Sequence, residues 1–507
     1  MSSPIRILQI SDTHISHGPE FDKIAFARGM EQVNHVSADY TIHTGDVTNG
    51  GTRADYDLAR RLLSGIDKKI IYIIGNHDAR NVGYELFDEY FGSRESVFVD
   101  DRVLIAGFDS TIPDRDGGRF GAMHIANLKR TLHKEGDGRI KIVAFHHHLV
   151  PIPRAGRERS MISDAGAVLK VILDYNVDLV LNGHRHSPNV YRVEDTVMVN
   201  SGTMSHYKTR AGDYHSYNRI EIDSGKVQVT VPSIEVRTEQ KFVRHIQRGN
   251  KLIGAHAPRI ARIVHLSDTH FTRGSEFLSE TFDVAAMRIN QLKPDLMVHC
   301  GDLTHSGLPE SFHLAIEKLS QLNAPKIVIP GTHDLVNVGD VYFERYFGTV
   351  NPIYNGDGFV LYGMNSSQFD EPEGIVGRAH IDALTSKLNS IPEKKVRIVA
   401  SHHHLMPIPR TREKYPIEDA GDVLRHLTNA GVDMILTGHR HISYTLKIEN
   451  TVVVNAGTLS SRRIQSQYGN TFNLIDILAN GTAVVSEINV ATGMRRILGI
   501  SKLVHHA

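Results

Sequence analysis

Carboxylates and histidines recur along the sequence in short polar motifs, and each motif follows an apolar run. In the first half the motifs are Asp-x-His, Gly-Asp, Gly-Asn-His-Asp, three consecutive histidines and Gly-His-Arg-His. Their oxygen and imidazole donors, without a thiolate, suit Mn²⁺, Fe²⁺ or Fe³⁺, Zn²⁺ or Co²⁺. The motifs place Asp12 and His14, Asp46, Asn76-His77-Asp78, His146, and His184 and His186 at the ends of these apolar runs, and together they offer seven ligands. One ion needs only about four to six donors, so this larger set predicts two ions that share a carboxylate and clamp a phosphoryl group.

Each motif alone also has a plain structural explanation. An Asp-x-His at a strand end can cap a helix or close a loop, and Gly-Asp usually marks a turn. Gly-His-Arg-His is more informative, because alternation along an extended segment directs both imidazoles to one face. The motifs favour a chemical site because they occur together, in order, at strand ends and twice over.

The second half of the chain repeats the first. Asp12 and Asp268 are 256 residues apart, and so are Asp46 and Asp302. Gly-His-Arg-His at 183–186 returns at 438–441, a slip of a single residue. One register over nearly the whole length indicates a duplicated domain rather than a solenoid. We expect domains at 1–240 and 259–498, joined by a polar and basic linker at 241–258.

Between the motifs the sequence alternates apolar runs with helical stretches. The runs are apolar on successive residues, which is typical of strands buried on both faces. In the first copy the predicted strands are 5–10, 40–43, 69–74, 139–145 and 177–182, and the predicted helices are 21–36, 53–65 and 165–175. This alternation implies a largely parallel sheet with the polar motifs at its carboxyl edge. Closer-set strands at 195–200, 217–222 and 226–231 predict a second sheet.

Composition narrows the class of partner. Lysine plus arginine and aspartate plus glutamate number 57 each, so the chain lacks the basic surplus typical of binding to nucleic acid polymers. A single cysteine, Cys300, fits a reducing compartment. The first residues show no basic segment with a long apolar core, and no run is long enough for a membrane span. We expect a cytoplasmic protein without a membrane or a nucleic acid polymer as partner.

The ordered motifs resemble the calcineurin-like metallophosphoesterase superfamily, and the likeness covers both copies almost end to end. Ser-Asp-Thr-His at 11–14, Gly-Asn-His-Asp at 75–78 and Gly-His-Arg-His at 183–186 resemble class III cyclic-nucleotide phosphodiesterases. Protein phosphatases of the superfamily carry Gly-Asn-His-Glu instead. Purple acid phosphatases need a tyrosine three residues after the aspartate, where this chain has Asn49 and His305. The resemblance implies an α/β fold with two tandem domains, each a two-sheet sandwich flanked by helices (αββα).

The resemblance also implies a role for each donor of the first copy. Asp12, His14 and His186 would hold one ion, while Asn76, His146 and His184 hold the other. Asp46 would bridge the two ions. His77 would protonate or stabilise the leaving oxygen, and Asn76, His77 and His147 would contact the substrate. His146 is preferred to its two neighbours because it comes first after the strand, where the family places its ligand.

The implied activity is a metal-dependent phosphodiesterase acting on a small phosphodiester by attack of a metal-bridging hydroxide. A nucleotide like 3′,5′-cyclic AMP is the favoured substrate. Similar sites cleave other phosphodiesters, and a phosphomonoesterase is a close alternative because the same ions stabilise a dianion.

The second copy differs at one donor. Asp268, His270, Asp302, His402, His439 and His441 occupy the matching metal positions, and His333 matches the catalytic histidine. Thr332 stands where the family has an asparagine. Its hydroxyl is shorter and a poorer ligand than a carboxamide, so we expect a weaker second ion and a slow or inactive site. Alternatively, a water lets Thr332 serve, or this copy is a non-catalytic regulatory or binding module. The duplication also allows the two copies to pair as a pseudo-dimer.

Overall fold

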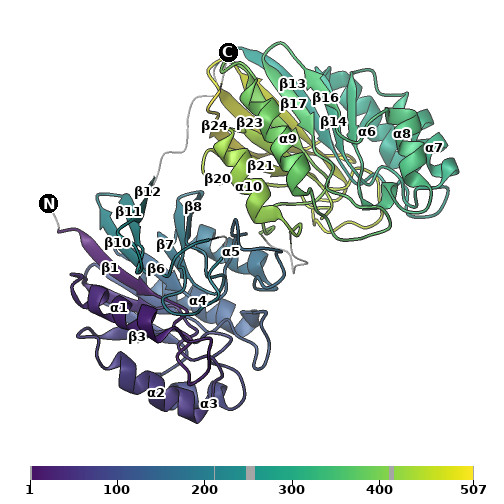
Figure 1. Ribbon diagram of the computed structural model, residues 1–507. Coiled ribbons are helices and arrows are strands. Elements are labelled where there is room, and N and C mark those ends of the chain that lie inside the picture. The colour runs from purple at the N-terminus through teal and green to yellow at the C-terminus, as the bar shows by residue number, and fades with distance from the viewer. Residues whose placement is uncertain (1–2, 211, 247–256, 410–415, 506–507) are drawn as a thin grey trace. The chain divides into compact units, whose positions relative to one another are not determined.

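The computed structural model describes residues 3–210, 212–246, 257–409 and 416–505. The chain divides into two compact units, one built from residues up to Gly249 and one built from most of the residues after it. We call them domain 1, drawn from purple to teal, and domain 2, drawn from green to yellow (Figure 1). Within the described part of the chain, no helix combines the length and the apolar character needed to cross a membrane.

The first sheet of domain 1 has the order β12-β11-β10-β1-β2-β3. β1, β2 and β3 run parallel, whereas β10, β11 and β12 continue from β1 as an antiparallel meander. The bounds are β1 Ile5–Ile10, β2 Tyr40–His43, β3 Ile70–Tyr72, β10 Asn218–Asp223, β11 Lys226–Pro232 and β12 Glu239–His245. β1 is therefore central, and its carboxyl end lies beside that of β2.

The second sheet of domain 1 has the order β8-β9-β7-β6-β5-β4. Its central strands β5, β6, β7 and β9 are parallel, and β4 and β8 are antiparallel to their neighbours. The bounds are β4 Ser96–Val99, β5 Val103–Gly107, β6 Ile140–Ala144, β7 Leu179–Asn182, β8 Asn189–Val193 and β9 Thr196–Asn200. Both sheets bury one face in a shared core that includes Ile7, Ile42, Ile142 and Leu181.

Helices cover the outer faces of this sandwich. Phe26 and Val33 of α1 and Leu58 of α2 pack with Leu8 and Ile10 of the first sheet in a separate cluster. On the second sheet, α4 packs against β5 and α5. The bounds are α1 Lys23–Asn34, α2 Arg53–Leu63, α3 Gly83–Phe91, α4 Gly121–Glu135 and α5 Ala165–Asp174.

Domain 2 repeats this architecture. Its sheets have the orders β15-β14-β13-β22-β23-β24 and β16-β17-β18-β19-β21-β20. The strands are β13 Arg259–Leu266, β14 Leu296–Cys300, β15 Lys326–Ile329, β16 Ile353–Asn355, β17 Phe359–Gly363, β18 Val396–Ala400, β19 Met434–Thr437, β20 Tyr444–Ile448, β21 Thr451–Asn455, β22 Thr471–Leu478, β23 Thr482–Asn489 and β24 Arg495–Lys502. The helices are α6 Ser279–Leu292, α7 Pro309–Leu319, the 3₁₀ turn η1 Thr332–Asp334, α8 Gly339–Phe347, α9 Arg378–Asn389 and α10 Ala420–Asn429.

The predicted α/β fold, with two tandem helix-flanked sandwiches, is confirmed. The predicted division of strands between the sheets is wrong. β6 and β7, predicted in one largely parallel sheet with β1, lie in the second sheet, and β10 and β11, predicted in a second sheet with β9, join β1. The apolar pattern does not distinguish these arrangements, because both sheets bury a face in the same core.

Strands lie across both expected domain ends. β12 runs from Glu239 to His245, across the expected domain end at 240 and into the stretch 241–258 treated as a linker. It pairs with β11 along its whole length. In domain 2, β24 continues past 498 to Lys502. We propose that domain 1 extends to His245 and domain 2 at least to Lys502. Most of the expected linker, 247–256, lies outside the described residues.

The packing of α6 predicts the cost of removing one aromatic ring. Phe282 is fully buried and contacts the rings of Phe271 and Phe277. We expect Phe282→Ala to lower the free energy of unfolding of domain 2 by about 3–5 kcal/mol, because the cavity cannot close completely. Met287, on the same helix, is 53% exposed, so Met287→Ala should change it by less than about 0.5 kcal/mol. Urea unfolding followed by circular dichroism measures both, and equal midpoints would contradict this packing.

Candidate metal centre

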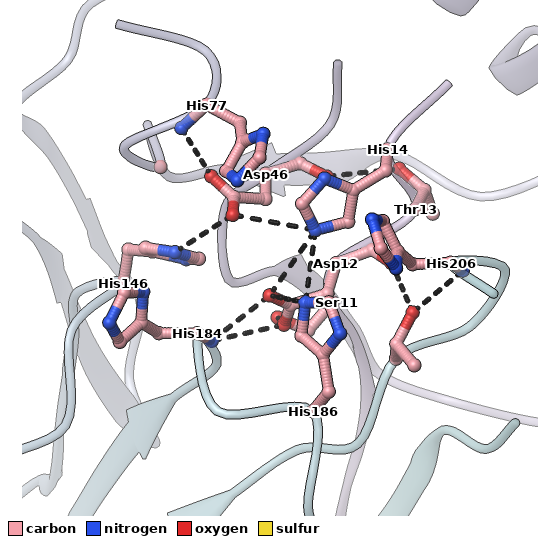
Figure 2. Close-up of polar contacts among 12 residues, drawn as sticks. Ser11, Asp12, Thr13, His14, Asp46, His77, His146, His184, His186 and His206 are labelled. Carbon is pink, nitrogen blue, oxygen red and sulfur yellow. Dashed lines mark hydrogen bonds and ion pairs between the residues drawn. The ribbon is translucent and has the colours of Figure 1, made fainter. Parts of the chain in front are cut away.

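The polar motifs of domain 1 come together at the carboxyl ends of five parallel strands. Asp12 and His14 follow β1, Asp46 follows β2 and Asn76 follows β3. From the second sheet, His146 follows β6, and His184 and His186 follow β7. Figure 2 shows Asp12, His14, Asp46, His146, His184 and His186 directed towards a common centre.

Asp46 lies between two groups of donors. One carboxylate oxygen, Oδ2, is 3.5 Å from His14 Nε2 and 3.3 Å from His146 Nε2. The other, Oδ1, accepts a hydrogen bond of 2.8 Å from the backbone N–H of His77. Figure 2 shows Asp46 reached by both imidazoles. The residue is buried, so this shared oxygen is available only to the two groups around it.

The first group contains Asp12, His14 and His186. His186 Nε2 is 3.3 Å from Asp12 Oδ1 and 3.1 Å from His14 Nε2. His186 Nδ1 donates to the carbonyl of Lys208 at 2.7 Å, and His14 Nδ1 lies 3.2 Å from Asn49 Oδ1. With both Nδ1 atoms acting as donors, the two Nε2 lone pairs face each other across the site. A cation between them satisfies both rings.

The second group contains Asn76, His146 and His184. Asn76 Oδ1 is 3.0 Å from His146 Nε2 and 2.9 Å from His184 Nδ1. His146 Nδ1 donates to the carbonyl of Thr44 at 2.8 Å, so its Nε2 presents a lone pair to Asn76 and Asp46. With neutral imidazoles, the amide oxygen and the two ring nitrogens that face it can each direct a lone pair at a second cation, which would replace any proton held between them.

The field of this site favours positive charge. Burial opposes charge on His146, but the carboxylates of Asp46 and Asp12 outweigh it and raise its pKa to about 9. Burial likewise opposes charge on Asp46, yet His146 and the other surrounding imidazoles hold the pKa of that carboxyl well below its usual range. The residues present therefore fit a pair of divalent or trivalent ions, as the donor types predict.

The backbone, rather than the side chains alone, places the donors. Five of them have left-handed φ angles: Asp12 52°, His14 47°, Asp46 53°, His184 74° and His186 52°. Such angles cost about 1–3 kcal/mol each in non-glycine residues. Hydrogen bonds between loops compensate, including those from Asp12 N to Gly45 O (3.0 Å) and from His14 N to Asp46 O (2.9 Å). Gly75 is needed here because a Cβ would lie 2.1 Å from the backbone nitrogen of Asp46.

The chain matches the family model described as calcineurin-like phosphoesterase twice, over residues 5–188 and over 261–443. It belongs to the calcineurin-like phosphoesterase family. It is accordingly a metal-dependent phosphoester hydrolase with the family's domain in tandem duplication. The resemblance expected from the motifs is thus confirmed.

Relatives of this phosphoesterase include several named phosphodiesterases. The 3′,5′-cyclic adenosine monophosphate phosphodiesterase CpdA of Vibrio vulnificus is 24% identical over 221 residues, which are 41% of this chain and 80% of the relative. CpdA of Escherichia coli K12 is 24% identical over 196 residues, 36% of this chain and 67% of the relative. The probable glycerophosphodiester phosphodiesterase GpdQ of Arcobacter nitrofigilis is 30% identical over 156 residues, 28% of this chain and 56% of the relative.

The expected catalytic histidine of the phosphoesterase stands beside the first group. The rings of His77 and His14 meet edge to face with centroids 4.5 Å apart. His77 Nδ1 lies 2.8 Å from the carbonyl oxygen of Asn49 and 3.0 Å from Arg80 Nη1, so this nitrogen is occupied by its neighbours and Nε2 is left for a ligand. Asp78 accepts backbone hydrogen bonds from Val47, Thr48 and Gly75, and thereby joins the Asp46 loop to the Asn76 loop. Burial and the nearby Asp46 raise the pKa of Asp78 to about 7.

The second and third histidines of the His-His-His run support neighbouring loops. His147 Nδ1 lies 2.9 Å from Ser110 Oγ, and Nε2–H donates to the carbonyl of Asp116 at 3.1 Å. Neither ring nitrogen of His147 is therefore free, and its expected contact with substrate remains a prediction. His148 Nε2 pairs with Glu158 at 2.6 Å, with both side chains 1% exposed.

His206 belongs to the site but was not among the residues predicted from the sequence. Its ring centroid is 4.4 Å from that of His14 and 4.9 Å from that of His186. Its Nδ1 accepts from the backbone N–H of Lys208 at 2.8 Å, so the neutral ring carries its proton on Nε2. Burial and the neighbouring imidazoles lower its pKa to about 2. A signal was available, since Gly-Thr-Met-Ser at 202–205 returns as Gly-Thr-Leu-Ser at 457–460.

Domain 2 of the phosphoesterase retains the first group of donors. Asp268 Oδ1 is 3.2 Å from His441 Nε2, which is 3.3 Å from His270 Nε2. Asp302 lies 3.7 Å from His270 and 3.3 Å from His402. The left-handed φ angles also recur: Asp268 54°, His270 51°, Asp302 51°, His439 71° and His441 53°.

The second group of domain 2 has lost its central oxygen. Thr332 Oγ1 is 3.1 Å from His403 Nε2, and Ser366 Oγ occupies His403 Nδ1 at 2.9 Å. The threonine hydroxyl is therefore hydrogen-bonded to His403. His402 Nε2 and His439 Nδ1 face each other directly at 3.2 Å, without the amide oxygen that Asn76 places between their counterparts.

This difference predicts the result of exchanging one residue between the domains. Thr332→Asn should supply the missing oxygen and strengthen binding of the second ion in domain 2 by roughly 10-fold or more. Asn76→Thr should weaken the second ion of domain 1 by a similar factor. Metal content after dialysis against graded Mn²⁺ measures both variants. Two tightly held ions in domain 2 of the unaltered chain, or no change on either exchange, would contradict the role given to Asn76.

Proposed function

We propose that this chain is a phosphodiesterase for small phosphodiesters, with a 3′,5′-cyclic AMP-like nucleotide as the favoured substrate and domain 1 as the catalytic domain. The observation that carries the proposal is the position of Asp46 Oδ2, within 3.5 Å of donors from both groups. One carboxylate oxygen between two sets of lone pairs suits a two-metal centre for phosphoryl chemistry.

The proposal assigns the donors as the family pattern implies. Asp12, His14 and His186 hold the first ion, Asn76, His146 and His184 hold the second, and Asp46 contacts both. Two ions of Mn²⁺, Fe²⁺ or Fe³⁺, Zn²⁺ or Co²⁺ would supply the positive charge that polarises the phosphoryl group and activates water. The second-ion site of domain 2 is assigned as weak.

We assign His77 as the residue that donates a proton to the leaving oxygen. His77 is partly exposed, and its Nδ1 is occupied by the carbonyl of Asn49 and by Arg80 Nη1. Its Nε2 therefore keeps one orientation and can hold a proton for the departing alkoxide. Its backbone N–H on Asp46 Oδ1 ties this imidazole to the bridging carboxylate.

The substrate class rests on the charge balance and on the names of the relatives. The chain has no net formal charge, which disfavours a nucleic acid polymer. Relatives named for cyclic AMP and for glycerophosphodiesters both act on small diesters by those names. We also place the protein in the cytoplasm, since its single cysteine, Cys300, is a buried free thiol and fits a reducing compartment.

Domain 2 is proposed as a weakened copy or a non-catalytic regulatory or binding module. The turn of Thr332 towards His403 supports this, because the His402–His439 pair lacks its third donor. The retained first group, from Asp268 to His441, supports the holding of an ion there.

Hydrolysis of 3′,5′-cyclic AMP and of bis(p-nitrophenyl) phosphate by the full chain with Mn²⁺ tests the substrate. We expect turnover of both, a loss on the order of 100-fold or more with Asp46→Ala, and a much smaller loss with the matched Asp302→Ala. Turnover of bis(p-nitrophenyl) phosphate alone would contradict the assignment of a cyclic nucleotide as substrate. Turnover of a phosphomonoester alone would make the protein a monoesterase.

Removal of metal gives a separate prediction. Dialysis against a chelator should lower diester hydrolysis by on the order of 100-fold or more, and added Mn²⁺ should restore it, because the donors alone supply no Lewis acid. Circular dichroism before and after dialysis controls for unfolding. Full activity in a chain shown to be free of metal would contradict the mechanism.

A further inference from the structure

The two domains differ at the position three residues after the shared carboxylate. Domain 1 has Asn49 there, and domain 2 has His305. In domain 1 the amide oxygen of Asn49 lies 3.2 Å from His14 Nδ1 and fixes the orientation of that imidazole. Domain 2 replaces this hydrogen-bond partner with a third imidazole beside its first group of donors.

Three histidines of domain 2 surround one point. Ring nitrogens of His270, His305 and His333 all lie within 4.8 Å of one another. The His305 ring is stacked on His333, with centroids 5.3 Å apart and an angle of 19° between the planes. Its centroid is 5.7 Å from that of His270, and His270 meets His333 edge to face at 4.8 Å.

Each of these imidazoles can direct one lone pair at an ion. For His270 that lone pair is on Nδ1, so its Nε2 then carries the proton and the ring does not serve the Asp268–His441 group at the same time. His333 Nδ1 lies 2.7 Å from the carbonyl oxygen of His305, so Nδ1–H donates there and Nε2 keeps its lone pair. The Nδ1 atoms of His305 and His270 are buried, and neither has a hydrogen-bond partner in the described part of the chain. Leaving a buried polar atom unsatisfied is unfavourable, and a bound cation would remove this cost.

We propose that His270, His305 and His333 form a three-imidazole site in domain 2 for a single borderline transition ion, of which Zn²⁺ is the representative. Neutral imidazole is a preferred ligand of Zn²⁺, Co²⁺, Ni²⁺ and Cu²⁺. Domain 1 cannot form this site because it has Asn49 in place of the third imidazole. The site rests on the contacts of domain 2 and is independent of the proposed cyclic-nucleotide activity.

The site changes the role of the histidine that matches His77. With its Nε2 on an ion, His333 has no nitrogen left to hold a proton for a leaving group, because Nδ1–H is committed to the His305 carbonyl. Domain 2 is then a metal-holding domain with a donor set that differs from the one in domain 1, rather than a slow duplicate of it.

The test uses the full chain with the domain 1 donors removed by Asp12→Ala and Asp46→Ala. In this background, Co²⁺ and Zn²⁺ are titrated against a chelating indicator, and the visible absorption of bound Co²⁺ is recorded. We expect His305→Asn and His333→Asn each to weaken one ion by about 10-fold or more and to change the Co²⁺ spectrum. His313→Asn, at an exposed position of α7, is the matched control and should change neither.

Further variants separate this site from the ordinary first group. Asp268→Asn removes a carboxylate of that group but should leave the three-imidazole ion in place. In the unaltered chain, His77→Asn should leave the metal content of domain 1 unchanged. Domain 1 carries Asn49 at the position of His305, so the His305→Asn variant should fit the local backbone. Circular dichroism of each variant checks that the fold is unchanged.

The proposal is overturned if His305→Asn and His333→Asn leave affinity and spectrum unchanged, in which case His305 only stacks on His333. It is also overturned if the ion is lost with Asp268→Asn and kept with His305→Asn. Asn49→His in domain 1 gives a converse measurement, since it should create a further Zn²⁺ site between His14 and His77.

Discussion

A buried carboxylate that serves two groups of donors is the constraint on which the arrangement of the surrounding loops depends. Taking Asp46 out of water is costly unless its charge is compensated, and the compensation must come from both sheets of the sandwich. In domain 1 one oxygen accepts a backbone hydrogen bond, and the other faces the donors of both groups. The loops after β1, β2, β3, β6 and β7 therefore have to end at the same point. The buried carboxyl of Asp78, with three backbone hydrogen bonds, holds two of them together.

Much of the donor cluster could be predicted from the sequence, because each donor follows an apolar run and parallel strands bring their carboxyl ends to one edge. The division of strands between the sheets could not, since either division buries the same residues. α4 was missed because only Leu128 and Leu132 are buried in its fifteen residues, too few for a clear helical period. His206 was missed because the histidine itself does not recur: the Gly-Thr-x-Ser motif before it is present in both copies, but the second copy has Ser461 at its position.

The two domains show how one scaffold can hold different donor sets. Domain 2 keeps the loop geometry around Asp302, including the hydrogen bond from the backbone N–H of His333 to its Oδ1 at 2.9 Å. What differs lies in the side chains that project from these loops. An amide oxygen has become the hydroxyl of Thr332, turned to His403, and a hydrogen-bonding amide has become the imidazole of His305. The two domains therefore share the backbone of the loops but differ in the side-chain atoms that can bind an ion.

The left-handed backbone of the donors suggests where such divergence can begin. The five donor positions with positive φ carry the same residue type in both domains. The three site positions that differ, Asn76/Thr332, Asn49/His305 and His206/Ser461, have ordinary backbone angles. A β-branched side chain such as threonine is badly strained at positive φ, but it meets no such penalty at position 332. Backbone conformation thus limits which positions can change after a duplication. Positions with ordinary φ angles accept other residue types and so other ligands, whereas positions with positive φ tolerate few residue types and keep the same donors in both domains.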